Sequence, residues 1–247
     1  MALRSFANGA LFAEVLGEGA PRILALHGWG RRGADFKPSL NGLPALAPDL
    51  PGFGATPPPG EVIGAEGYAA IVAEMLDEFD GPAVLVGHSF GGRVAICLAA
   101  RHPEAVSGIV LTGVPVIRLA PPVRPSWGYR AIRLLNHLGV FSDARLEEGR
   151  KRRGSADYRA ATGVMREVLV KVIAEIYQKE LEEVSAPITF LWGAGDTEIP
   201  VAVAERAVGI RHAAGRPAEL RVLEGVGHLL PLEAPAQLRS VVEAMIR

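Results

Sequence analysis

The stretch that decides the fold is Ala83-Val84-Leu85-Val86-Gly87-His88-Ser89-Phe90-Gly91-Gly92. Its first four residues form an apolar run typical of a buried strand, and a helical pattern begins at Arg93. Between them lies G-x-S-x-G, the pattern that places a serine in a sharp turn between a strand and a helix. Gly87 and Gly91 leave room for strand and helix to pass closely, because a side chain there would clash.

A serine in this turn is suited to act as a nucleophile. The turn directs the hydroxyl of Ser89 out of the end of the sheet, and the helix behind it offers backbone N–H groups to developing negative charge. A serine hydroxyl is a weak nucleophile at neutral pH, so a base and an orienting acid are expected elsewhere in the chain. We therefore predict nucleophilic catalysis at Ser89 rather than a serine that only caps the helix.

Outward from this stretch, short aliphatic runs alternate with amphipathic stretches, which is typical of a mostly parallel sheet covered by helices on both faces. An antiparallel hairpin is expected around Asn8-Gly9. Central strands are then expected at residues 22–26, 45–47, 83–86, 106–111, 188–192 and 220–223. Helices are expected at residues 65–79, 93–101, 202–208 and 235–246. The fold class is α/β.

Residues 114–185 break this alternation. Prolines keep the first part out of regular helix, and helices are expected at residues 129–138 and 158–181. These 72 residues are too long for a plain loop, so we predict a helical subdomain inserted into a core made of residues 1–113 and 186–247. Its most basic run is expected to be solvated surface, with weak docking of an acidic partner as the alternative. That run is Arg150, Lys151, Arg152 and Arg153.

The candidate base is one of six histidines. His228 lies on a short loop, Gly225-Val226-Gly227-His228, directly after the last expected strand, so it faces the same edge of the sheet as Ser89. His27 and His88 lie in glycine-containing turns whose backbone needs explain them. The remaining histidines lie at helix ends or in the insertion. We therefore predict that His228 is the base.

The candidate acid is Asp196, which leaves the strand at residues 188–192 through Gly193-Ala194-Gly195 and precedes His228 by 32 residues. Glu198 is a rival that could orient the imidazole if the loop were displaced. Asp49 is expected instead to hold its own turn through side-chain hydrogen bonds to the backbone.

An oxyanion hole is the third requirement of this chemistry. The strand at residues 22–26 ends at His27-Gly28-Trp29-Gly30, where glycines let the backbone approach a substrate oxygen. We predict that the backbone N–H groups of Trp29 and Phe90 form the hole. The side chains of Trp29, Phe90 and Leu229 are expected to line the substrate pocket, with a core position as the alternative for the Trp29 indole.

Composition narrows the function further. The 247 residues carry 26 basic and 27 acidic side chains, and this balance argues against a general nucleic-acid binder. The single cysteine, Cys97, excludes a disulfide framework and a cysteine-based zinc site, and its apolar neighbours predict a small buried side chain. The sequence has neither a signal-peptide pattern nor an apolar run of membrane-spanning length. We therefore expect a cytoplasmic protein that does not associate with membranes.

The chain resembles the α/β-hydrolase fold superfamily along nearly its full length, and the likeness rests on the Ser89 turn and four further strings. They are Leu26-His27-Gly28-Trp29-Gly30, Asp49-Leu50-Pro51-Gly52-Phe53-Gly54, Trp192-Gly193-Ala194-Gly195-Asp196, and Gly227-His228 with Pro231-Leu232-Glu233-Ala234-Pro235. The order Ser89, Asp196, His228 is that of the family's triad. The resemblance implies an α/β-hydrolase fold with a helical cap over the site. The His-Gly-Trp-Gly string is similar to that of carboxylesterases that demethylate a carrier-bound pimeloyl ester.

The expected function is hydrolysis of a carboxylic ester, or a related acyl bond, of a small to medium apolar substrate by a Ser-His-Asp triad. No metal and no organic cofactor is expected. A serine at position 89 argues against the family's epoxide hydrolases and haloalkane dehalogenases, which place an aspartate there. C–C bond hydrolases, lactonases and cofactor-free perhydrolases use the same triad and stay open as alternatives. A receptor that encloses a small ligand under the cap is an alternative from another class.

Overall fold

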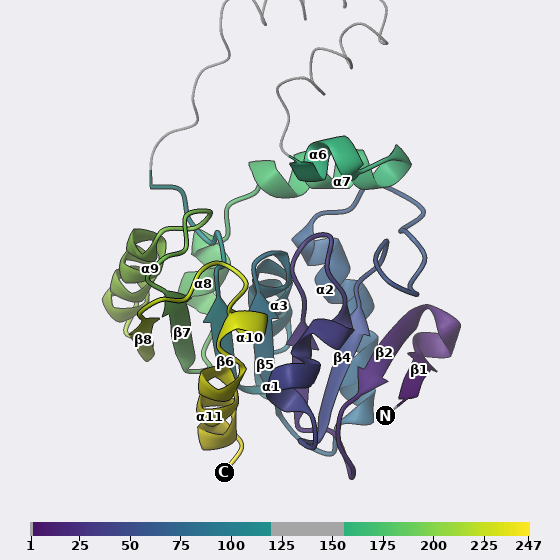
Figure 1. The fold of residues 1–247 in the computed structure, drawn as a ribbon, viewed down its shortest axis with the longest axis horizontal. Coiled ribbons are helices and arrows are strands. Elements are labelled where there is room, and N and C mark those ends of the chain that lie inside the picture. Colours follow the sequence, from purple (N-terminus) through teal and green to yellow (C-terminus); the bar gives the residue numbers. More distant parts are fainter. Residues whose placement is uncertain (1, 120–155) are drawn as a thin grey trace, which may run out of the picture.

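The computed structural model describes residues 2–119 and 156–247. In this part of the chain an eight-stranded sheet forms the centre of the molecule, in the order β1-β2-β4-β3-β5-β6-β7-β8 (Figure 1). The strands from β3 to β8 pair in parallel, whereas β1 pairs with β2 and β2 with β4 in antiparallel register. This is the expected α/β architecture. The strands are β1 (Ala2–Phe6), β2 (Leu11–Val15), β3 (Ile23–Leu26), β4 (Ala45–Asp49), β5 (Ala83–His88), β6 (Val106–Thr112), β7 (Ile188–Gly193) and β8 (Ala218–Leu223).

The opening hairpin turns where the sequence predicted. Ala7, Asn8 and Gly9 have φ values of 50°, 54° and 91°, so three consecutive residues adopt the left-handed region between β1 and β2. Asparagine and glycine tolerate this conformation better than other residues, which is why the Asn8-Gly9 pair indicated the turn.

Helices cover both faces of the sheet because the central strands are apolar on both sides. Leu24 and Leu26 of β3 face one helix layer, and Ile23 and Ala25 face the other. The first layer holds α2 (Ala65–Ala73), α3 (Phe90–Arg101), α8 (Gln178–Glu183) and α9 (Val201–Ala213). The second layer holds α1 (Lys37–Leu40), α10 (Leu230–Glu233) and α11 (Pro235–Met245).

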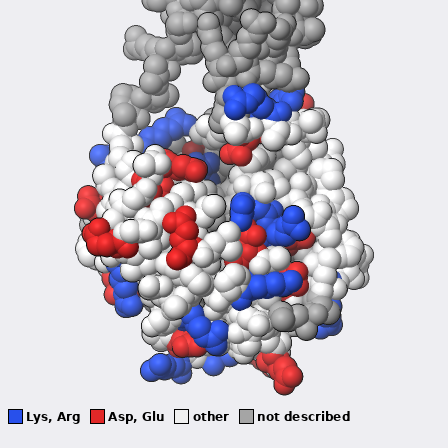
Figure 2. Space-filling view, in the orientation of Figure 1, with Lys and Arg blue, Asp and Glu red and all other residues white. Residues whose placement is uncertain are grey.

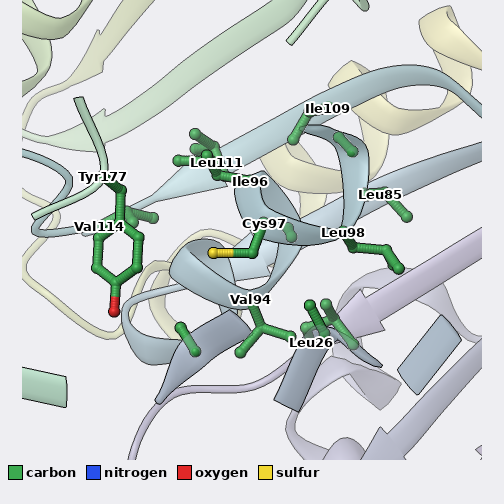
Figure 3. Close-up of a cluster of buried hydrophobic side chains, with 14 of the residues drawn as sticks. Leu26, Leu85, Val94, Ile96, Cys97, Leu98, Ile109, Leu111, Val114 and Tyr177 are labelled. Atoms are coloured by element: carbon green, nitrogen blue, oxygen red, sulfur yellow. The ribbon is translucent and has the colours of Figure 1, made fainter. Parts of the chain in front are cut away.

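The helix that follows Ser89 lies at the centre of the first layer. Figure 3 shows Val94, Cys97 and Leu98 of α3 among aliphatic side chains of the neighbouring strands. Cys97 is 3% exposed, and burial raises the pKa of its thiol to about 12. It is the small buried side chain that its sequence neighbours predicted.

The segment between β6 and β7 differs from the expected pattern. Residues 158–181 form parts of three helices instead of one, namely α6 (Ala156–Ala160), α7 (Gly163–Ala174) and α8. Thr162 before α7 and Glu175 after it are both extended, so regular helix is interrupted on each side of α7. The expected helix at residues 129–138 and the basic run Arg150, Lys151, Arg152, Arg153 lie outside the described residues.

The end of α7 is set by contacts that are remote in sequence. Arg93 donates to the carbonyl of Val172 at 2.6 Å, and Arg118 donates to the carbonyls of Ile173 and Ala174 at 2.9 Å each. The last carbonyls of a helix lack partners within the helix and carry partial negative charge, so two guanidinium groups stabilise the end at this point. Through Arg93, α7 is bonded to the helix that starts next to Ser89.

The helices α6 and α7 lie across the carboxyl end of the parallel strands in Figure 1. Met165 of α7 covers Gly52: a Cβ added to Gly52 would lie 2.2 Å from the sulfur of Met165. Val168 of α7 is fully buried against the first helix layer. Within the described ranges, none of the helices is both long and apolar enough to cross a membrane.

Candidate active site

Ser89 lies in a strained turn between β5 and α3. Its φ of 49° and ψ of −114° are values that residues with a side chain rarely adopt. The turn is bonded to the end of the neighbouring strand β6, because the Ser89 N–H donates to the carbonyl of Thr112 at 2.9 Å. A Cβ on Gly91 would lie 2.1 Å from the carbonyl oxygen of Leu26, and one on Gly87 would lie 2.5 Å from the Cα of Gly92. The close passage predicted for both glycines is therefore confirmed.

Asp196 and His228 lie on two loops at the same edge of the sheet and are hydrogen-bonded to each other. Nδ1 of His228 is 2.9 Å from Oδ2 of Asp196. The loops are joined by their backbones, because the Gly195 N–H donates to the carbonyl of Val226 at 2.9 Å. The structure thus brings together two residues that are 32 positions apart.

The carboxylate of Asp196 uses its two oxygens for different partners. Oδ1 accepts the backbone N–H groups of Glu198 at 3.0 Å and Ile199 at 2.8 Å, which leaves Oδ2 for His228. An ionised carboxylate only accepts hydrogen bonds, so the proton of a neutral His228 ring is held on Nδ1. Nε2 is then unprotonated and available to accept a proton.

The electrostatics of the pair favour its charged forms. Burial by itself would raise the pKa of Asp196, but the hydrogen bonds from His228, Ile199 and Glu198 leave the pKa below its usual value. Burial would likewise lower the pKa of His228, but the hydrogen bond and charge of Asp196, together with the charges of Glu198 and Glu233, raise it. The imidazolium form of His228 is therefore stabilised.

The free nitrogen of His228 faces a second carboxylate. Nε2 lies 3.6 Å from Oε2 of Glu198, whose side chain is 70% exposed. Among the described residues, no hydrogen bond joins Ser89 to His228, and the ring centroid of His88, the residue before Ser89, lies 5.0 Å from that of His228. Glu198 contacts the nitrogen opposite to the one that Asp196 binds, so its position differs from that of an orienting acid.

His88, which directly precedes Ser89, is a buried neutral imidazole. Its Nδ1 lies 2.9 Å from Oγ1 and 3.1 Å from the carbonyl oxygen of Thr112. Burial, together with the neighbouring His228, lowers the pKa of His88 to about 3. His88 therefore places no second positive charge beside His228 at neutral pH.

The loop after β3 is held by His27. The Leu50 N–H donates to Nε2 of His27 at 2.9 Å, so the ring proton is on Nδ1, which donates to the carbonyl of Gly28 at 2.8 Å. Burial lowers the pKa of His27 to about 4, which keeps this neutral form. Because C=O and N–H point in opposite directions across a trans peptide, the fixed Gly28 carbonyl also sets the direction of the Trp29 N–H. The sequence did not predict that His27 orients this loop, because a position at the end of a strand was the only indication that it offered.

Asp49 holds its own turn, as its sequence context predicted, and it also binds the distant backbone at Gly33. Oδ1 accepts the Gly33 N–H and Oδ2 accepts the Ala55 N–H, each at 2.8 Å. Both carboxylate oxygens are therefore engaged by the backbone, and Asp49 is not the partner of His228.

The three residues expected to line the pocket lie in two places. Trp29 and Phe90 pack edge to face with ring centroids 5.4 Å apart, and Phe90 also packs on Tyr68 at 4.9 Å. Phe90 is 4% exposed, whereas Trp29 is half-buried. Leu229 instead lines a shallow depression together with Gly28 and His88. Their role in substrate binding stays a prediction.

Charged side chains of both signs are interspersed on the face drawn in Figure 2. This matches a formal net charge of −1. Within residues 2–119 and 156–247, no cluster of three His, Cys, Asp or Glu side chains has the arrangement of a metal site.

The model of the α/β-hydrolase family matches residues 23–241. The chain is 28% identical to the pimeloyl-[acyl-carrier protein] methyl ester esterase of Aromatoleum aromaticum, over 92% of this chain and 98% of that protein. It is 26% identical to the biotin biosynthesis bifunctional protein BioHC of Cellvibrio japonicus, over 90% of this chain but only 47% of that protein. The meta-cleavage product hydrolase CumD of Pseudomonas fluorescens has a similar structure, with a TM-score of 0.69, 20% identity and coverage of 98% of this chain and 97% of that one.

The family match covers most of the chain, so the protein belongs to the α/β-hydrolase family. It is carboxylesterase-like within that family. At 20% identity the likeness to CumD shows the fold alone.

Proposed function

We propose that the protein is a serine hydrolase that cleaves a carboxylic ester, or a related acyl bond, of a small to medium apolar substrate. The observation that carries this proposal is the Asp196–His228 hydrogen bond of 2.9 Å at the edge of the sheet where Ser89 lies in its strained turn. The chain order Ser89, Asp196, His228 and the family match support it.

In the proposed reaction the hydroxyl oxygen of Ser89 attacks the ester carbonyl while Nε2 of His228 takes its proton. The negative charge on the carbonyl oxygen is bound by the N–H groups of Trp29 and Phe90. His228 then gives its proton to the leaving alcohol, and an acyl-enzyme remains. A water molecule that loses a proton to His228 attacks the acyl group, and the acid leaves when His228 returns that proton to Ser89. Throughout, Asp196 holds the tautomer and stabilises the imidazolium.

In this mechanism the side chain of Glu198 has to move away from Nε2 of His228. Its carboxylate lies 3.6 Å from Nε2 of His228, the nitrogen that serves Ser89 in the reaction. Because its side chain is 70% exposed, Glu198 can turn into solvent at little cost when a substrate reaches the site. We therefore assign the orienting role to Asp196 and not to Glu198.

The cap is part of the proposal. We propose that residues 114–185 form a cap whose helices cover the site and set the preferred acyl chain. Two contacts support it: Met165 of α7 lies on Gly52, and Arg93 of α3 bonds the last turn of α7. An ester as the substrate class is supported by the Aromatoleum aromaticum relative, whose name specifies a methyl ester. Docking of an acidic partner at Arg150, Lys151, Arg152 and Arg153 stays a prediction.

The experiment is a panel of p-nitrophenyl esters of increasing chain length, assayed with the wild type, Ser89→Ala and the matched control Ser107→Ala. Ser107 is an exposed serine at the other end of the sheet, at the start of β6. We expect turnover by the wild type and the control, and a loss of kcat on the order of 10⁶-fold in Ser89→Ala.

The other results would contradict the proposal in identifiable ways. Turnover that persists in Ser89→Ala would exclude Ser89 as the nucleophile. A wild type that turns over no ester but cleaves a C–C bond, opens a lactone or forms a peracid would be one of the other hydrolases. A single slow turnover with stabilisation by a bound ligand would indicate a receptor.

A further inference from the structure

The side chain of Glu233 holds the backbone on both sides of His228. Glu233 is the last residue of α10, and its carboxylate reaches back to the loop before that helix. Oε2 accepts the N–H of Gly227 at 2.5 Å, and Oε1 accepts the N–H of Leu229 at 3.1 Å. One carboxylate thus bonds the two residues that flank His228.

Backbone hydrogen bonds close the same loop. The Glu233 N–H donates to the carbonyl of Leu229 at 3.0 Å, so Glu233 and Leu229 bond each other in both directions. The carbonyl of His228 accepts the N–H of Leu230 at 2.9 Å. In a capping box, a glutamate at the third helical position binds the N–H of the capping residue; Glu233 binds the N–H of Leu229, which caps α10, from the fourth position. Here the residue that it immobilises is the neighbour of His228.

Gly227 makes this close approach feasible. A Cβ at position 227 would lie 3.1 Å from Oε2 and 3.3 Å from Oε1 of Glu233. These distances are shorter than ordinary van der Waals contact, so a methyl group there would push the carboxylate away. Position 227 therefore offers a second way to disturb the contact without changing Glu233.

We propose that Glu233 is a positioning residue for His228, and that it holds the imidazole against Asp196 by binding the N–H groups of Gly227 and Leu229. The catalytic consequence of this clamp rests on the proposed function. The structural consequence is independent of the proposed function: the imidazole of His228 is held in place, and the negative charge of Glu233 stabilises its protonated form.

The clamp also has an electrostatic effect, because Glu233 is one of several charged groups around His228. Asp196 and Glu198 face the ring from the loop after β7, Glu233 acts from α10, and neutral His88 faces it from β5. The negative charge of Glu233 contributes to the raised pKa of His228. Removal of that charge should therefore lower the pKa and move the acid limb of the pH–rate profile to lower pH. The effect should shrink with added salt, because Glu233 is exposed.

The test compares Glu233→Gln, Glu233→Ala and Gly227→Ala with the matched control Glu224→Gln, an exposed glutamate in the same loop region. Glutamine keeps one acceptor oxygen, but its NH₂ group faces the other backbone N–H, so one of the two bonds is lost. The readouts are kcat and KM for p-nitrophenyl acetate across pH, and the titration of His228 followed by NMR of histidine-labelled protein at low salt.

We expect Glu233→Ala to lose ~10- to 100-fold in kcat with KM within about twofold, since a small misplacement of a reacting group costs this much. Glu233→Gln and Gly227→Ala should lose less. The pKa of His228 should fall in both Glu233 variants and stay unchanged in Glu224→Gln. If Glu233→Ala does not fold, Glu233→Gln and Gly227→Ala provide the same comparison.

The results separate this proposal from the proposed function. Ester turnover that is absent in the wild type refutes the proposed function, while the NMR titration still tests the clamp. A wild-type kcat and an unchanged His228 titration in the Glu233 variants overturn the clamp. The clamp is also overturned by a Glu233 variant that loses both thermal stability and activity while His228 titrates as in the wild type. In that case Glu233 would serve only the stability of the fold.

Discussion

Replacing Asp196 by asparagine should invert the tautomer of His228. The side-chain oxygen Oδ1 accepts two backbone N–H groups, those of Glu198 and Ile199. An asparagine at position 196 has one acceptor oxygen, and these two donors will orient it toward themselves. The NH₂ group then occupies the place of Oδ2, 2.9 Å from Nδ1 of His228. Nδ1 must accept that hydrogen bond, so the ring proton moves to Nε2.

The expected loss of activity follows from the position of that proton. With Nε2 protonated, His228 cannot accept the proton of Ser89, and the stabilising charge of Asp196 on the imidazolium is lost as well. A loss of ~10⁴-fold in kcat is typical of this substitution in serine hydrolases that use such a triad. It corresponds to ~5 kcal/mol of transition-state free energy. The free energy of unfolding should fall by only about 1–2 kcal/mol, because both backbone hydrogen bonds keep an acceptor.

The assay is steady-state hydrolysis of p-nitrophenyl esters, with thermal unfolding of each variant as the control for folding. Glu198→Gln is the matched variant, because Glu198 contacts the other nitrogen of the same ring. It should keep kcat within about tenfold, the effect of a single exposed charge. A wild-type rate in Asp196→Asn together with a collapse in Glu198→Gln would refute the reasoning and move the orienting role to Glu198.

Three further predictions concern pH and stability. The pH–rate profile should rise with pH through a midpoint above 6.5, because the pKa of His228 is raised and the base must be neutral; a midpoint below 6.5 would contradict this. Gly91→Ala should destabilise the fold strongly in urea denaturation, since its Cβ would lie 2.1 Å from a backbone oxygen. Gly209 lies on α9 with open space around it, so Gly209→Ala should instead raise the free energy of unfolding by ~1 kcal/mol. Equal effects of the two substitutions would contradict the close packing described at Gly91. Arg211→Met should cost at least ~3 kcal/mol in the same assay, because the fully buried guanidinium bonds four backbone carbonyls, while exposed Arg206→Met should cost little.

The sequence predicted the parts of the structure that depend on local patterns. Aliphatic runs marked the central strands to within a few residues, and Asn8-Gly9 marked the hairpin, because both signals arise from neighbouring residues. The turn at Ser89 was recognisable for the same reason, since strand, glycine spacing and helix occur in one stretch. The pairing of Asp196 with His228 was a topological inference: both follow parallel strands, so both reach the same edge of the sheet.

Contacts between distant segments were beyond the sequence argument. The end of α7 depends on Arg93 and Arg118, which come from other elements, so the helix expected at residues 158–181 was drawn too long. The approach of Glu198 to Nε2 of His228 depends on how one loop curves after Asp196. The sequence showed Glu233 only as part of a family motif. Its hydrogen bonds to Gly227 and Leu229 depend on how its side chain reaches back to the loop before α10, and the sequence pattern does not show this.

The most direct test of the central claim is the site of covalent labelling by a fluorophosphonate, read by peptide mass spectrometry alongside loss of esterase activity. We expect one adduct per chain, on Ser89, in proportion to the activity lost. Ser89→Ala should take up no label, and Ser107→Ala should label like the wild type. A label on another serine, or full labelling of Ser89→Ala, would contradict the assignment of Ser89 as the nucleophile.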